Sequence, residues 1–167
     1  MKKLLTILCL VLLVSCSNEV PSDKLVERNG ITYEINSTTP FTGSSVEYYI
    51  NGQLKEKNNY KNGNLDGSSE GYFENGQLNE RRNYKNGYWD GLRESYYENG
   101  QLEYRENYKD GTYDGLQEWF DENGQLRGKG NFIVEKKDGK LHGLVEHFDE
   151  DGNLTKTEEY KNGELIE

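Results

Sequence analysis

Four glutamates recur at one position of a repeated stretch, and paired carboxylates are a common arrangement for general acid–base catalysis. Each lies three residues after a glycine: Glu70, Glu94, Glu118 and Glu146. On alternate strands of an antiparallel sheet they would lie about 9.6 Å apart, within the range of roughly 5 to 10 Å that a hydrolytic carboxylate pair needs. Near-identical surroundings, however, do not separate an acid from a base. We therefore expect a structural column, solvated or bonded to tyrosine, with weak divalent-cation binding and a hydrolase as alternatives.

The two histidines, His142 and His147, form no catalytic or metal-binding pattern in the sequence. Neither has a cysteine or a second histidine at the spacing of a zinc site. No Ser-His-Asp order, phosphate-binding loop or dinucleotide fingerprint emerges either, because the glycines recur with the turns. The sequence thus predicts a protein that is not an enzyme and that holds no cofactor or metal.

Aromatic residues form a second candidate site, for binding rather than catalysis. Tyr49, Phe73 and Tyr97 each lie six residues after the glycine that begins a copy of the repeat. We expect them, together with Trp119, to point away from the core, and a row of exposed aromatic side chains commonly marks a contact surface. The alternative is that tyrosine is frequent here because it favours strands.

The N-terminus has the pattern of a bacterial lipoprotein. Two lysines precede an apolar run, Leu4–Val14, which is too short to span a bilayer as a helix. The run ends in Leu13-Val14-Ser15-Cys16, which resembles the lipobox of bacterial lipoproteins. This resemblance implies a signal peptide over residues 1–15, acylation of Cys16 and an anchor in a bacterial membrane, facing outside the cytoplasm. An uncleaved anchor and a plain secretory signal are the alternatives.

Thiols and charge limit the possible ligands. Both cysteines, Cys9 and Cys16, lie in this N-terminal segment, so the rest of the chain has no thiol for a disulfide, a zinc site or a nucleophile. The formal charge is −10, and removal of Lys2 and Lys3 with the signal peptide makes it −12. Such an acidic surface repels phosphates, which argues against nucleic acid as a partner.

The candidate residues belong to a repeat with a period of about 24 residues. Asn-Gly or Asp-Gly recurs at steps of 24, 24, 24 and 28 residues, and a period of this size indicates an array of stacked units. Five glycines begin the copies and are called the box glycines here: Gly43, Gly67, Gly91, Gly115 and Gly143. In every copy an aromatic residue lies five positions after the box glycine and a leucine eleven positions after it.

Each copy is predicted to form two strands joined by Asn-Gly turns, the strongest short hairpin signal. A three-residue loop with glycine in the left-handed region sets Tyr48 opposite Leu54, and a two-residue turn sets Tyr60 opposite Leu65. We expect these columns to form a core on one face. That arrangement requires one bulge in each copy, which we place at Gly91 and the equivalent box glycines.

Upstream of the repeats, residues 25–42 are expected to form an opening hairpin around Asn29-Gly30 and a lead-in, and residues 16–24 a lipidated cysteine and tether. The repeat array takes residues 43–167. The sequence thus predicts an all-β fold, an elongated and twisted antiparallel sheet of stacked hairpins with about five copies of 24 residues and about twelve strands.

The segment YYENGQLEYRENYKDGTYDG, residues 96–115, is similar to the MORN repeat (membrane occupation and recognition nexus), in the antitoxin-like variant common in bacteria. The resemblance covers about residues 41–167 in five copies. It implies a curved antiparallel sheet of stacked hairpins that serves as a binding or scaffolding surface. Both lipid and protein partners have been proposed for members of the family.

Together these observations favour a membrane-anchored bacterial lipoprotein whose repeat sheet binds another protein or acts as a scaffold. Tyrosine suits a binding surface because it offers a large amphipathic area at low entropic cost. The alternative is an antitoxin-like or immunity protein that neutralises a toxin through its acidic surface, since complementary charges steer association.

Overall fold

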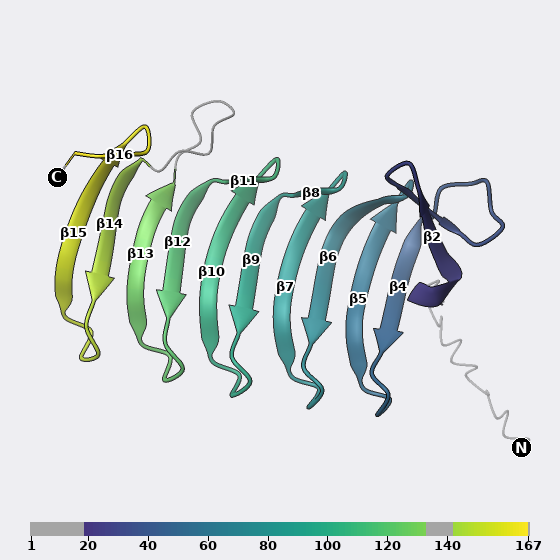
Figure 1. Cartoon of the computed structure of the whole chain (residues 1–167), viewed down its shortest axis with the longest axis horizontal. Helices are drawn as coiled ribbons and strands as arrows, with labels where there is room; N and C mark the ends of the chain where they lie inside the picture. The colour runs from purple at the N-terminus through teal and green to yellow at the C-terminus, as the bar shows by residue number, and fades with distance from the viewer. Residues whose placement is uncertain (1–18, 133–141, 167) are drawn as a thin grey trace, which may run out of the picture.

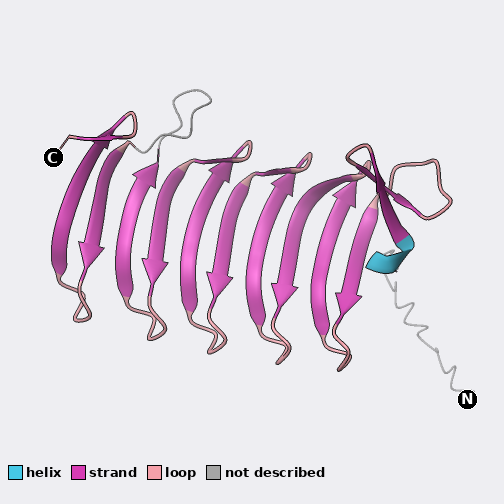
Figure 2. Cartoon of the chain, in the orientation of Figure 1, coloured by secondary structure: helices cyan, strands magenta, loops and turns pink. Residues whose placement is uncertain are grey.

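The computed structural model describes residues 19–132 and 142–166. These residues form a 14-stranded sheet and a separate two-stranded sheet, and the strands of the large sheet lie side by side almost in chain order (Figure 1). Within the described chain, a single short 3-10 turn is the only helix (Figure 2). The elongated all-β sheet predicted from the sequence is therefore confirmed, with 14 strands in the large sheet instead of about twelve.

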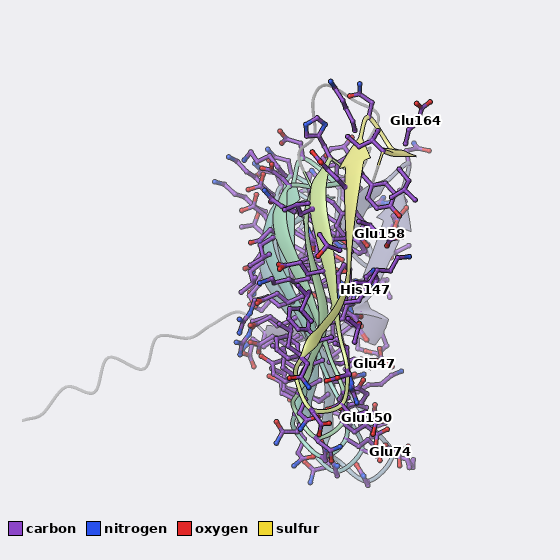
Figure 3. All side chains as sticks on the ribbon, turned by 90° about the vertical axis from the view of Figure 1, so that its left-hand side faces the viewer. Glu47, Glu74, His147, Glu150, Glu158 and Glu164 are labelled. Carbon is purple, nitrogen blue, oxygen red and sulfur yellow. The ribbon has the colours of Figure 1, made fainter. Side chains whose placement is uncertain are left out.

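Each copy of the repeat contributes two long antiparallel strands, which pair with each other and with strands of the adjacent copies. In chain order, the long strands are β4 (Gly43–Tyr48), β5 (Leu54–Lys61), β6 (Asn64–Tyr72), β7 (Leu78–Lys85), β9 (Gly91–Tyr96), β10 (Leu102–Lys109), β12 (Gly115–Phe120), β13 (Leu126–Phe132), β14 (Gly143–Phe148) and β15 (Leu154–Lys161). The sheet seen from its end in Figure 3 is a single layer.

One edge of the sheet, the lower edge in Figure 1, carries a three-residue loop in every copy. In the first loop the amide of Tyr49 donates to the carbonyl of Gln53 (2.8 Å), and the amide of Gly52 donates back to Tyr49 (2.9 Å). Gly52 has a φ of 85°, the left-handed conformation that glycine adopts without strain. The predicted register follows in all five copies: Tyr48 pairs with Leu54, Tyr72 with Leu78, Tyr96 with Leu102, Phe120 with Leu126 and Phe148 with Leu154.

The opposite, upper edge carries two-residue turns. Asn62 and Gly63 have φ values of 51° and 78°, as a type I′ turn requires, and Tyr60 pairs with Leu65 as predicted. After the equivalent turns the chain forms three short strands: β8 (Tyr88–Trp89), β11 (Thr112–Tyr113) and β16 (Glu164–Leu165). The amide of Gly87 donates to the carbonyl of Leu65 in the preceding copy (2.8 Å). Neighbouring copies are therefore hydrogen bonded through their turns as well as through their strands.

The expectation that all the aromatic columns share one face is wrong. An irregularity does occur at the box glycines, and Gly91 has a φ of 105°. However, Tyr84 pairs with Trp89 and Arg81 with Glu94. Arg81 lies three positions from Tyr84 along β7, whereas Glu94 lies five positions from Trp89. The segment from Trp89 to Glu94 therefore contains two more residues than a regular ladder would have. One additional residue would exchange the faces, whereas two additional residues leave them unchanged.

The columns consequently divide between two faces of the sheet. We call the face that carries Trp89 and Tyr108 the Trp89 face, and the face that carries Glu94 and Tyr96 the Tyr96 face. On the Trp89 face, the ring of Tyr108 lies 4.7 Å from the ring of Trp89 and 4.7 Å from that of Tyr113. Tyr108 is one of the few buried apolar side chains of the described chain, with 6 % of its surface exposed. The aromatic core of the central copies therefore lies on the Trp89 face.

The N-terminal end of the array is covered by four short elements. They are β1 (Glu19–Pro21), the 3-10 turn η1 (Ser22–Lys24), β2 (Leu25–Arg28) and β3 (Ile31–Glu34). β1 adds to the sheet as a parallel neighbour of β4, so residues 19–24 are ordered structure where the sequence indicated a tether. β2 and β3 form the opening hairpin around Asn29-Gly30 that the sequence indicated.

This opening hairpin is fastened to the first upper turn. The amide of Thr32 donates to the carbonyl of Gly63 (2.9 Å), and the amide of Gly63 donates to the carbonyl of Phe41 (2.7 Å). Phe41 is 4 % exposed, and its ring lies 5.6 Å from that of Tyr60. The hairpin thus continues the stack of turns, and Phe41 in the lead-in after it supplies the aromatic neighbour that Tyr60 of the first copy would otherwise lack.

Candidate functional site

Two of the four predicted binding residues connect adjacent copies at the lower edge. The hydroxyl of Tyr49 donates to the carbonyl of Tyr72 (2.7 Å), and the hydroxyl of Tyr97 donates to the carbonyl of Phe120 (3.0 Å). Each hydroxyl therefore reaches the backbone of the next copy along the array. These tyrosines tie the first loop to the second and the third loop to the fourth, a role that the sequence did not predict.

Phe73 and Tyr97 lie together in a groove of about 510 Å³ at the lower edge. The groove crosses the tips of three successive hairpins, β6–β7, β9–β10 and β12–β13. Three groups of residues line it: the aromatic residues Phe73, Tyr96 and Tyr97, the glutamates Glu98, Glu103 and Glu122, and the amides Asn79 and Asn99. We call it the loop groove. It combines apolar ring surface with carboxylates and contains no basic residue among its described lining.

Two lining residues of the loop groove, Asn79 and Glu103, are each the extra residue of a β-bulge. Leu102 pairs with Tyr96 and Tyr104 pairs with Ser95, which leaves Glu103 without an opposite residue. The buried hydroxyl of Ser95 donates to a carboxylate oxygen of Glu103 (2.8 Å). Neither residue is predictable from the sequence, because no glycine or turn dipeptide marks this position.

The loop groove is electrostatically negative. Partial burial, followed by the charges of Glu103, Glu122 and Asp121, raises the pKa of Tyr97. Ionisation of the Tyr97 hydroxyl is disfavoured because it would place a further negative charge beside these carboxylates. The same field favours a positively charged group in the groove.

The other two predicted residues lie elsewhere. Tyr49 is one copy nearer the N-terminus than Phe73. Trp119 pairs with Tyr104 on one side and Gly128 on the other, which places it on the Trp89 face. The expectation that Trp119 points away from the core is therefore wrong, because that face also carries the aromatic core.

The glutamate column has structural partners on the Tyr96 face. Glu70 accepts a hydrogen bond from the hydroxyl of Tyr72 (2.7 Å) and one from Arg81 (3.0 Å). The hydrogen bond from Tyr72, and then the contact with Arg81, lower the pKa of Glu70. A catalytic acid would need a shift in the opposite direction.

The next members of the column repeat this pattern. Glu94 accepts from the hydroxyl of Tyr96 (3.1 Å) and from Arg105 (3.2 Å), and Arg105 also reaches Glu118 (3.4 Å). In the last copy Lys129 pairs with Glu146 (2.9 Å). The predicted tyrosine-bonded structural column is thus confirmed for the first two members, and the later members are paired with cations.

A buried charge cluster lies on the Trp89 face and was not predicted. Arg93 donates to Glu80, Glu106 and the hydroxyl of Tyr104, each at 2.6 Å. Burial opposes the charge of Arg93, but the hydrogen bonds to Glu80 and Glu106 outweigh it and raise the pKa of Arg93. All these groups are satisfied by one another, so the cluster ties three adjacent strands together. The only sequence signal is a single arginine two residues after a box glycine.

The histidines do not come together. A ring nitrogen of His147 lies 2.9 Å from a carboxylate oxygen of Glu158 on the neighbouring strand (Figure 3). His142 instead lies just before β14, in a hollow that residues of β12, β13 and β14 line. Over residues 19–132 and 142–166, no group of three or more His, Cys, Asp or Glu side chains is placed to hold a metal ion. Cys16 and the lipobox lie outside the described residues.

Comparison with known families assigns the repeats. The model of the MORN repeat variant matches five segments of the chain, residues 41–62, 65–86, 89–110, 113–133 and 141–162. The chain belongs to the MORN repeat variant family. In this MORN sheet, each matched segment begins two residues before a box glycine, and all but the fourth end at the first residue of an upper turn. The family unit is therefore one long hairpin with its three-residue loop.

A comparison with curated proteins finds no match to the chain. The MORN repeats are consistent with a protein-binding or scaffolding module. In the part of the chain that the structure describes, no helix is long and apolar enough to cross a membrane.

Proposed function

We propose that this MORN-repeat chain is a lipid-anchored bacterial envelope protein whose sheet binds or scaffolds another protein through the loop groove. The observation that carries the proposal is the groove itself, where Phe73 and Tyr97 offer ring surface beside carboxylates and amides. Grooves with an apolar floor and a few polar groups are the usual form of recognition sites. The rigid row of hairpins supports this use, because a preorganised site costs less entropy on binding.

The membrane anchor is proposed from the N-terminal residues. The lysine pair, the apolar run Leu4–Val14 and the tetrapeptide ending at Cys16 support acylation of that cysteine. Two or more acyl chains hold a protein stably on a membrane, whereas a single chain does so only marginally. We expect metabolic labelling with an alkyne palmitate analogue to mark the full chain and to be lost in Cys16→Ser.

We propose a binding role without catalysis. The glutamates that could have acted as acid and base are engaged with Tyr72, Arg81, Arg105 and Lys129. A hydrolytic activity that disappears in the double variant Glu94→Gln/Glu118→Gln would contradict this part of the proposal.

A second candidate is an antitoxin-like or immunity protein that covers the basic face of a toxin. The formal charge of −10 and the acidic lining of the loop groove favour it. Complex formation with a basic toxin, abolished by raised salt, would separate this role from a scaffold held mainly by apolar contacts.

Crosslinking in intact cells tests the leading proposal. Full-length tagged protein is crosslinked chemically, captured and identified by mass spectrometry, beside Phe73→Ala in the groove. Tyr88→Ala is the matched control, because Tyr88 is a 63 % exposed aromatic residue at the upper edge. We expect one protein adduct that Phe73→Ala reduces and Tyr88→Ala retains. Equal loss or equal retention in both variants would refute the loop groove as the contact site.

A further inference from the structure

We propose that the loop groove binds a basic segment of the partner protein in polyproline II conformation, with lysine or arginine at every third residue. This inference rests on the proposed function, which makes the groove the contact site. It is carried by the composition of the groove, by the spacing of the loops along the lower edge and by the charge of the protein.

The groove provides two surfaces for such a ligand. Phe73 and Tyr97 present rings on which prolines pack and over which a cation is attracted. Glu98 and Glu122 line the same groove, and neither forms an ion pair with any residue of the described chain. Their charges are therefore available to an incoming lysine or arginine.

The acidic positions continue along the lower edge beyond the groove. The first residue of the three-residue loop is a glutamate in the last four copies: Glu74, Glu98, Glu122 and Glu150. Figure 3, which looks along the array, shows that Glu74 and Glu150 both lie at the lower edge of the sheet, in copies far apart from each other. In the first copy the equivalent residue is Ile50, which is fully exposed.

Hydrogen bonds fix the loops relative to one another. The side-chain amide of Asn99 donates to the carbonyl of Glu122 (2.6 Å), and that of Asn51 donates to the carbonyl of Glu74 (3.1 Å). The hydroxyl of Tyr97 adds a third such link. The loop of Ile50 is thus tied to that of Glu74, and the loop of Glu98 to that of Glu122, which fixes the two groove glutamates relative to each other.

The spacing of this row selects the conformation of the ligand. Equivalent positions in adjacent copies are separated by two strand spacings, about 9.6 Å. A polyproline II helix has three residues per turn and rises about 3.1 Å per residue, so its equivalent side chains recur about every 9.3 Å. An extended β-strand repeats its side chains about every 6.6 Å, which does not match the row. A basic residue at every third position of a polyproline II segment therefore meets one loop after another.

The net charge of the protein and the low conformational entropy of a polyproline II segment both favour this ligand. The protein carries a formal charge of −10, so a basic segment is steered toward it while phosphate-bearing surfaces are repelled. Polyproline II is already populated in proline-rich chains, so little conformational entropy is lost on binding.

Peptide binding to the full chain in detergent tests the inference. The probe is a labelled fifteen-residue peptide of five Lys-Pro-Pro units, and the control peptide has the same composition with its five lysines together at one end. We expect the periodic peptide to bind about tenfold more tightly, from several exposed ion pairs and cation–π contacts acting together. The double variant Glu98→Gln/Glu122→Gln should lose this preference.

A second double variant, Glu34→Gln/Glu164→Gln, removes the same charge from exposed sites outside the groove and should keep the preference. Circular dichroism confirms that each variant remains folded. Equal affinity for the two peptides, or a preference that survives Glu98→Gln/Glu122→Gln, overturns the inference. If crosslinking still places a partner at Phe73 while the peptides bind equally, the inference fails and the proposed function stands.

Discussion

At the scale of single residues, the position six after the box glycine shows two ways of fixing the lower loop, and only Phe73 in the second copy uses neither. Tyr49 and Tyr97 donate to the next copy. In the later copies Asp121 instead accepts from the amides of Asn123 and Gln125 in its own loop (2.9 and 3.0 Å). The exchange of tyrosine for aspartate replaces a link between copies with a cap inside one loop. The sequence showed the exchange but not its meaning, because the acceptor of the tyrosine lies 23 residues away.

Removing one bridging hydroxyl should weaken the array measurably. We expect Tyr49→Phe to lower the free energy of unfolding by about 1 kcal/mol, since its hydrogen bond to Tyr72 is lost and a carbonyl is left unpaired. Urea denaturation measures the change. Tyr48→Phe is the control, because Tyr48 is 55 % exposed and should change stability by less than about 0.5 kcal/mol. Equal effects in the two variants would contradict the bridging role.

Tyr72 should make the free energy of unfolding decrease with rising pH in the alkaline range. Partial burial and the hydrogen bond to Glu70 raise the pKa of Tyr72 to about 12, while a tyrosine in the unfolded chain ionises near pH 10. The stabilisation from this hydroxyl is therefore fully present below about pH 10 and is lost as the pH rises toward 12. We expect the difference in unfolding free energy between the protein and Tyr72→Phe to shrink over that interval. A difference that stays constant from pH 8 to 12 would disprove the assignment.

At the scale of elements, the turns were predictable and the faces were not. Asn62-Gly63 and the loop ending at Gly52 carry local signals that determine turn type and hence the pairing of their flanking residues. Whether Trp89 and Tyr96 lie on the same face of the sheet depends on whether one or two extra residues occur at the box glycine. Glycine is compatible with both. The bulge at Glu103 and the buried partners of Arg93 come from pairings between strands, which no local signal reports. The sequence therefore predicted Phe73 and Tyr97 as binding residues but not the carboxylate beside them.

The opening hairpin gives a prediction at this scale. A β-carbon at Gly63 would overlap Ile31 and lie 2.8 Å from the carbonyl oxygen of Thr32, whereas at Gly30 it would have no neighbour within 4 Å. Both glycines have a φ of 78°, so both alanine variants share the same backbone strain. We expect Gly63→Ala to be about 1 to 3 kcal/mol less stable than Gly30→Ala. Similar melting curves for the two would show that the hairpin is not packed on the turn.

At the scale of the whole molecule, the sheet is a one-dimensional array in which each copy contacts its neighbours. Stability in such a fold is close to a sum of terms from adjacent copies, and one copy can be removed without changing the register of the others. Asp90 and Gly115 are the residues on either side of a complete copy, and joining them restores an Asp-Gly box.

We expect deletion of residues 91–114 to leave a folded sheet with unchanged β content per residue. Its urea m-value should fall by roughly one fifth, because about one fifth of the array no longer exposes surface on unfolding. Circular dichroism and urea titration measure both quantities. Loss of cooperative unfolding after the deletion would contradict the additive view of the array.

Photocrosslinking in living cells tests directly whether a partner protein binds at the loop groove. A photoreactive side chain replaces Glu98 in the groove or Tyr88 at the upper edge of the full-length protein. We expect a light-dependent protein adduct of defined mass from position 98, reduced by Phe73→Ala, and none from position 88. No adduct from position 98, or the same adduct from both positions, would contradict this expectation.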